Sequence, residues 1–163
     1  MSDLAAFRQE VVRPTLFHLQ AYHPQMWSPA AENLIVGTAA HESGGLKHLR
    51  QIGGGPARGV FQIELDTAID IWANYLHSRT KLEGLILGLL WPLKAQSITD
   101  QLIWNFVYAA AMARLVYWRK LEPLPDADDI EGMGKYWGRH YQTSSDPEKI
   151  AQFVSDYTLY VKE

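Results

Sequence analysis

Apolar residues recur at helical spacing along almost the whole chain. Leu4, Phe7 and Val11 lie on one face of a first predicted helix, which we expect to kink or end at Pro14. Ser28-Pro29 predicts the start of a second helix, because a capping hydroxyl is followed by proline at the first helical position. The same periodicity predicts further helices over residues 66–76, 82–90, 98–117, 128–141 and from 147 to 161.

The segment after residue 43 has a different character. Gly44-Gly45 predicts the end of the second helix, and residues 46–60 are rich in glycine. No sustained alternation of apolar and polar residues indicates a long strand. We therefore expect a mainly α fold with at most a small β-hairpin near residues 47–63, and one domain over residues 1–163.

Composition narrows the possible functions. A length of 163 residues with 47% hydrophobic and 20% charged residues is typical of one folded domain. The net charge of −3 argues against a nucleic-acid partner, because phosphate binding needs a cationic surface. The absence of cysteine excludes disulfides, thiolate metal sites and a cysteine nucleophile.

The chain shows no sign of a targeting or membrane segment. The first fourteen residues include Asp3 and Glu10 and lack an apolar core, so we expect no signal peptide. The most hydrophobic stretch, residues 82–93, is shorter than the roughly 20 residues that a membrane-spanning helix needs. The sequence predicts a protein that is soluble in the producing cell.

Glu42 is the residue with the strongest chemical indication. In the helix predicted to end at Ser43, Ile35, Thr38 and Glu42 share one face. An apolar face and the helix C-terminus both disfavour a negative charge, so both would raise the pKa of the carboxyl, as a general acid requires. The alternative from this helix alone is a surface glutamate at a fraying end.

Two short motifs between residues 41 and 62 resemble the signature of a known enzyme family. The run His41-Glu42-Ser43-Gly44-Gly45 is followed by Ala57-x-Gly59-Val60-Phe61-Gln62. Together they resemble the signature of soluble lytic transglycosylases and goose-type lysozymes, in which a Glu-Ser pair ends a helix and a Gly-Leu-Met-Gln-like loop follows. The resemblance implies a lysozyme-like fold that cleaves peptidoglycan without a cofactor.

The resemblance also implies roles for individual residues. Glu42 would be the catalytic acid, and Gln62 would line the sugar-binding cleft beside Ser43. Arg58 could meet carboxylates of the peptide stems. Further residues come from looser matches: Tyr108 in a small-residue helix, Tyr141 in an aromatic segment beside the cleft, and Tyr157 or Tyr160 as a tyrosine that bonds the acid.

The reaction depends on a second carboxylate. A lytic transglycosylase needs none, because the 6-hydroxyl of N-acetylmuramic acid attacks its own anomeric carbon. A hydrolytic muramidase positions water with a second acid, and Glu64 occupies the place where goose-type lysozymes carry an aspartate. Glu64 is thus a candidate base, and the equal alternative is a solvated acid of the loop. Asp66 also lies nearby, but we expect it to cap the helix that it starts. A third alternative is a non-catalytic phage structural or wall-binding protein on the same scaffold.

Other motifs are weaker. His41, Glu42 and His48 do not have the spacing of a zinc motif, so no metal site is expected. The glycine-rich loop lacks the Lys-Ser/Thr ending of a phosphate loop. Several tryptophans and tyrosines, Trp137 among them, could stack on sugars, but core packing is the better interpretation for each. The expected partners are peptidoglycan strands on the cell-wall side and, in a phage-encoded protein, other proteins of the virion.

Overall fold

The computed structural model describes residues 2–92 and 97–162. Helices make up most of it, and a small antiparallel hairpin is its β-structure, so the mainly α prediction is confirmed. The end of the apolar stretch 82–93 lies outside the described residues. Within them, no helix has the length and apolar character needed to cross a membrane.

The N-terminal helix runs through Pro14 instead of ending there. It consists of α1 (Asp3–Phe7), a π-helical segment η1 (Arg8–Val12) and α2 (Arg13–Leu19). Proline lacks an N–H and collides with the carbonyl four residues earlier. The wider π-turn lies immediately before that position, and it lets the helix continue.

Helix α3 (Pro29–Ser43) begins and ends where the sequence predicts. The hydroxyl of Ser28 accepts a hydrogen bond from the N–H of Ala31, and Gly44 ends the helix in the left-handed conformation with φ of 61°. A short 3₁₀ turn, η2 (Pro24–Met26), precedes the helix.

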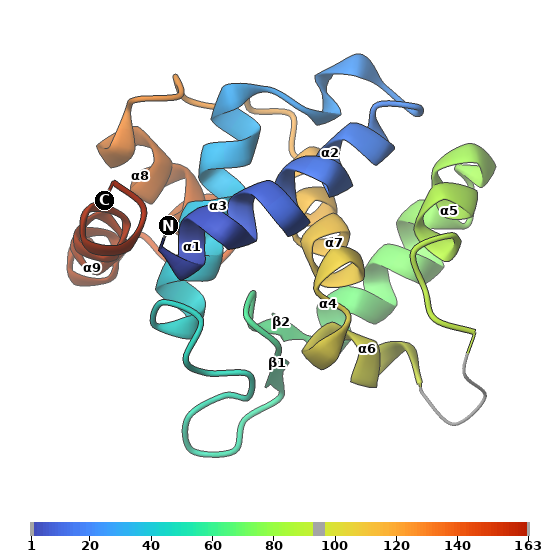
Figure 1. Cartoon of the computed structure of the whole chain (residues 1–163), viewed down its shortest axis with the longest axis horizontal. Coiled ribbons are helices and arrows are strands. Elements are labelled where there is room, and N and C mark those ends of the chain that lie inside the picture. Colours follow the sequence, from blue (N-terminus) through green and yellow to red (C-terminus); the bar gives the residue numbers. More distant parts are fainter. Residues whose placement is uncertain (1, 93–96, 163) are drawn as a thin grey trace.

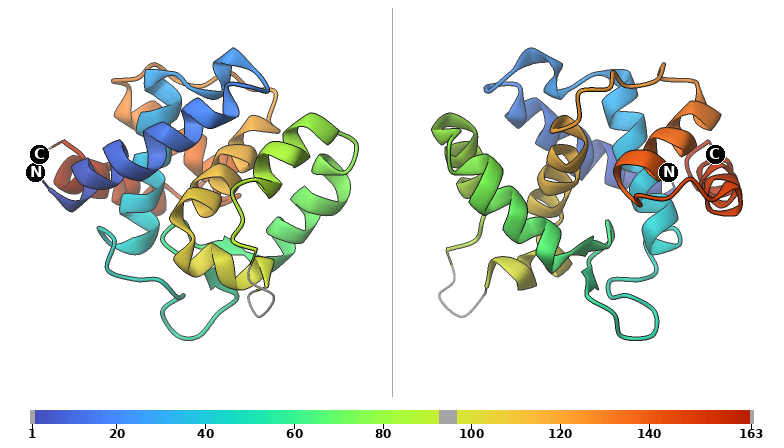
Figure 2. Two further views of the ribbon diagram at one scale, coloured as in Figure 1. Left: turned by 45° about the vertical axis from the view of Figure 1, so that its right-hand side comes forward. Right: turned by 180° about the vertical axis from the view of Figure 1, so that it is seen from behind.

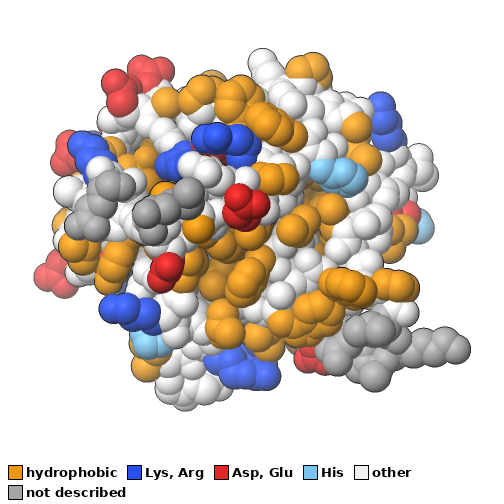
Figure 3. Space-filling model, in the orientation of Figure 1, with side chains coloured by type: hydrophobic (Ala, Val, Ile, Leu, Met, Phe, Trp, Pro, Cys, Tyr) orange, Lys and Arg blue, Asp and Glu red, His pale blue; other side chains and the backbone are white. Residues whose placement is uncertain are grey.

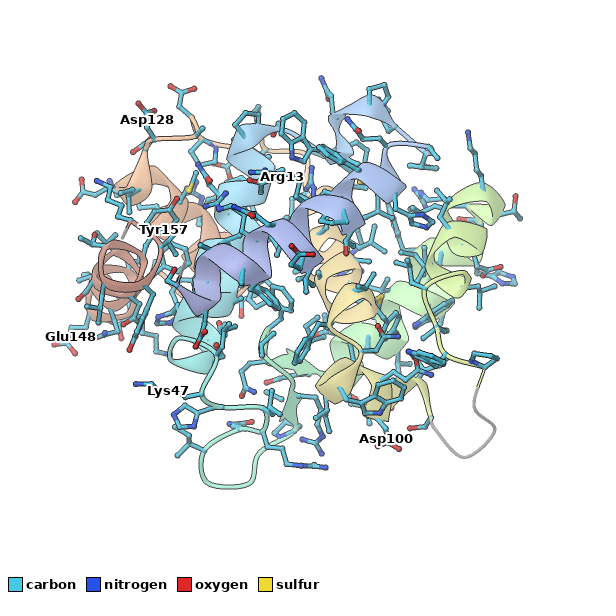
Figure 4. The ribbon with its side chains drawn as sticks, viewed as in Figure 1. Arg13, Lys47, Asp100, Asp128, Glu148 and Tyr157 are labelled. Carbon is cyan, nitrogen blue, oxygen red and sulfur yellow. The ribbon has the colours of Figure 1, made fainter. Side chains whose placement is uncertain are left out.

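An ion cluster fastens α3 to the N-terminal helix. Arg8 and Arg13 each donate to the Glu32 carboxylate at 2.7 Å, and Figure 4 shows Arg13 lying over α3. Burial alone would raise the pKa of Glu32, but hydrogen bonds from Arg13, Trp27 and Arg8 outweigh it and lower the pKa to about 2. The negative charge of Glu32 is thus balanced by the two arginines, and these ion pairs hold α3 against the N-terminal helix.

The hairpin forms at the end of the predicted 47–63 segment. Strands β1 (Ala57–Arg58) and β2 (Ile63–Glu64) pair antiparallel, and the chain turns between them. Helix α4 (Leu65–Asp70) follows at once and continues as the π-helical η3 (Ile71–Leu76). The expectation that Asp66 caps this helix is wrong: Glu64 holds the cap position without a side-chain bond, and Asp66 lies in the first turn.

The apolar run 98–117 is broken at Asn105 into two helices. Helix α6 (Ile98–Trp104) ends just before Asn105. The side chain of Asn105 accepts a hydrogen bond from the N–H of Tyr108 and so caps α7 (Phe106–Trp118). An asparagine side chain that bonds the local backbone competes with continued helix. Helix α5 (Thr80–Leu87) precedes this pair.

Two C-terminal helices complete the fold. Helix α8 (Ile130–His140) and helix α9 (Pro147–Tyr160) pack on α3, and Asp129 and Asp146 supply their caps. Figures 1 and 2 show α3 and α7 in the middle, α8 and α9 on one side, and α4 and α5 on the other. The hairpin lies at the lower end of α3 and α7 in Figure 1, next to the C-terminus of α3, which carries Glu42.

Candidate functional site

A cavity of about 190 Å³ opens at the C-terminus of α3. Four side chains singled out from the sequence line it: Glu42, Gln62, Glu64 and Tyr141. They come from α3, from the hairpin and from the residue that follows α8, so separate parts of the chain build the site. The remaining lining residues are Ile63, Thr67, Val116, Gln142 and Thr143.

The environment of Glu42 suits a proton donor. Burial raises the pKa of its carboxyl to about 7, and it does so against the opposing effects of a hydrogen bond from Trp137 and the positive charge of Lys149. Trp137 Nε1 donates to Glu42 Oε1 at 3.0 Å. Within residues 2–92 and 97–162, no donor binds the other oxygen, Oε2. At pH 7 the carboxyl is therefore about half protonated, and it has an oxygen free to deliver the proton.

Trp137 is itself held firmly. Its ring stacks on Phe153 at 5.3 Å between centroids, and the His41 ring makes a T-shaped contact with it at 4.6 Å between centroids. His41 Nδ1 lies 2.7 Å from a carboxylate oxygen of Asp156 in α9. This packing fixes the direction of the indole N–H, and through it the position of the Glu42 carboxyl.

Trp137 was not predicted as the partner of Glu42, and the tyrosines expected in that role lie elsewhere. Tyr157 packs against Gly37 of α3, and Figure 4 shows it between α9 and α3. Tyr160 lies against Gly45. The indication that could have found Trp137 was weak: it is one of many aromatic residues at helical spacing.

The turn of the hairpin presents Gln62 to the cavity. Its backbone has φ of 48°, which is uncommon for a residue other than glycine. Its side-chain amide donates to the carbonyl of Gly59 at 2.8 Å. Thr143, which also lines the cavity, likewise has a positive φ of 55°. Backbone strain of this kind gathers at binding and catalytic sites.

Tyr141 joins the turn to the end of α8. Its hydroxyl donates to the carbonyl oxygen of Phe61 at 2.5 Å. Burial, together with the negative charge of Glu42 and the neighbouring Tyr117, raises the pKa of Tyr141 well above its ordinary value. Tyr141 therefore stays protonated, and its one hydroxyl proton is used to hold the turn of the hairpin against the end of α8.

Three predicted substrate-binding residues do not line this cavity. Ser43 is fully buried, and its hydroxyl donates to the carbonyl of Ala39 and accepts from the N–H of Leu46, so it shapes the helix end. Tyr108 is also fully buried and accepts from Trp72 Nε1. Arg58 donates to the carbonyls of Gly55 and Ala57 inside its own loop.

The chemistry of the site also depends on whether the surroundings of the cavity could bind a metal ion or carry a strong charge of one sign. In the part of the chain that the structure describes, no cluster of three or more histidine, aspartate or glutamate residues could hold a metal ion. Basic and acidic side chains are interspersed on the face shown in Figure 3. The chemistry that this site offers is acid–base chemistry by Glu42, with Glu64 as a second carboxylate on the same cavity.

A change at Trp137 tests how the pKa of Glu42 is set. We expect Trp137→Phe to raise that pKa by about one unit, because it removes a hydrogen bond to the charged form. Carbon NMR titration of the glutamate carboxyls measures the value directly. Trp72→Phe, which removes an indole bonded to Tyr108 instead, should leave it unchanged. A pKa that falls or stays the same in Trp137→Phe would contradict this account.

Comparison of the chain with protein-family models, with curated proteins and with solved structures finds no match. The assignment of a function therefore depends on the geometry of the site and on the motifs of the sequence.

Proposed function

We propose that the protein is a lysozyme-like glycosidase that cleaves the β-1,4 bond between N-acetylmuramic acid and N-acetylglucosamine in peptidoglycan. The observation that carries this proposal is the Glu42 carboxyl, which lines a cavity with Gln62 and has a pKa of about 7. Glycoside cleavage requires an acid that is still protonated near neutral pH to protonate the leaving oxygen. The motifs around Glu42 and Gln62 point to the sugar polymer.

The proposed reaction follows from the position of one acid. Glu42 gives its proton to the glycosidic oxygen, and the bond from that oxygen to the anomeric carbon of the muramic acid breaks. The resulting Glu42 carboxylate then accepts the proton of the attacking group. In a lytic transglycosylase that group is the 6-hydroxyl of the same sugar, and the product is a 1,6-anhydro ring.

The single-acid route is the one we favour, because it requires no catalytic group beyond Glu42, whose carboxyl lines the cavity. One observation favours hydrolysis as a second candidate: Glu64 lines the same cavity. In that case Glu64 would take a proton from water, which attacks the anomeric carbon and leaves a reducing end.

Product analysis tests the proposal. Purified protein is incubated with purified peptidoglycan, and the soluble fragments are analysed by mass spectrometry, with Glu42→Gln as the inactive control. Anhydro ends would support the transglycosylase, and reducing ends would support the hydrolase. Equal release by the two proteins, or no soluble fragments at all, would overturn the enzyme proposal in favour of a non-catalytic protein.

The role of Glu64 has its own test. For a transglycosylase, we expect Glu64→Gln to change the rate of fragment release by less than about threefold. A general base contributes about 10²–10⁴-fold, so a hydrolase would lose at least a hundredfold. Asp66→Asn is the matched control, because Asp66 is an exposed acid two residues further along that does not line the cavity.

A further inference from the structure

A second hollow, of about 800 Å³, lies between the start of α3, the end of α7 and the segment 120–127. It shares no lining residue with the Glu42 cavity. The segments that border it lie at the end of α3 and α7 away from the hairpin (Figures 1 and 2). Its volume is in the range of pockets that bind small organic ligands or short peptides.

The wall of this hollow is mostly apolar. Four aromatic residues line it, Trp27, Tyr117, Trp118 and Tyr136, with prolines on both sides. Leu121 also borders the hollow and is fully exposed. Such a wall suits an apolar side chain of a ligand better than a sugar, which needs many hydrogen-bonding partners.

Arg114 places a buried positive charge in this wall. Its side chain lines the hollow, and the residue is only 3% exposed. Its guanidinium donates to two carbonyl oxygens, those of Met26 and Gln25, at 2.9 and 3.2 Å. No carboxylate within the described residues forms an ion pair with it. Burial lowers the pKa of Arg114 to about 10, as expected for a cation that has lost its water without gaining a counter-charge.

The other charged groups of the hollow leave this cation available. The carboxylate of Glu122 is paired with Arg139 and His140 on α8. Lys120 adds a second positive charge to the lining, while Asp126 is an acid on the same segment. A buried guanidinium without a carboxylate partner favours a ligand that brings its own anion, and carboxylate is the anion that it binds in bidentate geometry.

We infer that this hollow is a binding site for a short peptide with a free C-terminal carboxylate, which pairs with Arg114 while an apolar side chain packs on the aromatic wall. The inference goes beyond the proposed function, since it concerns a different part of the molecule. It assigns Arg114 a ligand in addition to its role in fastening the turn at residues 25–26.

The test compares two peptides that differ in one group. Acetyl-Ala-Leu-Ala with a free carboxylate and the same peptide as its C-terminal amide are titrated into the protein, and the indole N–H signals of Trp27 and Trp118 are followed by NMR. We expect the amide to bind at least about tenfold more weakly, because it loses a charge-assisted hydrogen bond. Equal binding of acid and amide, or no binding of either, would overturn the inference.

Protein variants complete the test. Leu121→Asp places a like charge at the hollow without disturbing the core, and should weaken binding of the acid by at least about threefold. Leu159→Asp, at an exposed leucine of α9 outside the hollow, should leave it unchanged. Glu42→Gln should also bind normally, so that failure of the proposed enzyme activity and failure of this site are distinguished. Tighter binding of N-acetylmuramic acid than of the peptide would reassign the hollow to a sugar acid.

Discussion

Glu42→Gln is expected to reduce the release of peptidoglycan fragments about a thousandfold. Glutamine keeps the shape of the side chain and can still accept from Trp137, but it has no proton to give to the leaving oxygen. General acid catalysis contributes about 10²–10⁴-fold in enzymes. Fragment release is measured at pH 6, where a carboxyl with a pKa of about 7 is mostly protonated. A variant that keeps more than a tenth of the activity would exclude Glu42 as the acid.

The same substitution should stabilise the folded protein in alkaline conditions. The pKa of Glu42 is about 7 in the folded state, against an ordinary value of 4.5 for a glutamate in the unfolded chain. Between these values the folded state holds a proton that the unfolded chain has lost, so the contribution of Glu42 to stability falls as the pH rises from 4.5 to 7. Above pH 7 the buried charge costs on the order of 2 kcal/mol after allowance for its partial exposure. Glu42→Gln does not carry this cost.

Thermal unfolding at several pH values measures this effect. The Tm of Glu42→Gln should exceed that of the parent by about 4–8 °C at pH 8, and the difference should vanish near pH 4.5. Glu148→Gln is the control, because Glu148 is exposed on α9 and points away from the core in Figure 4. A gain in Tm that does not depend on pH would mean that the carboxyl is not destabilised by burial.

Local signals in the sequence located both ends of α3. Ser28-Pro29 and Gly44 set the limits of α3 through bonds to residues only a few positions away. The hairpin was predicted for the same reason, since glycines at 53–55 and 59 mark the turns around it. Because α3 ends where predicted, Glu42 falls on the cavity beside Gln62.

The partners of Glu42 and the cap at Asn105 could not be predicted in this way. The indole of Trp137 is 95 residues from Glu42 in the sequence, and only the packing of α8 on α3 and α9 brings it there. Asn105 binds the carbonyl of Leu89 as well as the N–H of Tyr108, so its cap depends partly on a distant loop. The spacing of apolar residues along one sequence reports local structure, and it does not show which distant segments come into contact.

Ser43 and Tyr108 show the opposite error. The motif suggested substrate contacts for both, yet each hydroxyl is used inside the protein. A motif conserves the residues that shape a site as well as those that touch a ligand, and the sequence alone does not separate the two. Burial does separate them, because both residues are fully buried while Gln62 and Glu64 reach the cavity.

Gly59→Ala is expected to destabilise the protein by about 3 kcal/mol or more and to lower its Tm by about 10 °C. A Cβ at this position would lie 1.9 Å from the carbonyl oxygen of Leu102 in α6, which is backbone and cannot move aside as a side chain could. The φ of 77° adds strain for any residue with a Cβ. The turn that holds Gln62 and the carbonyl of Phe61 must shift away from α6, and so we expect activity to fall with stability.

Gly53→Ala separates the two causes. Gly53 has a similar φ of 87°, but a Cβ there would meet nothing within 4 Å. This variant carries the backbone strain without the collision, so it should cost only about 1 kcal/mol and leave the cavity intact. Thermal unfolding and fragment release are measured for both variants. If Gly53→Ala were as damaging as Gly59→Ala, the close approach of the hairpin to α6 would not be what fixes the turn, and the position of Gln62 would need another explanation.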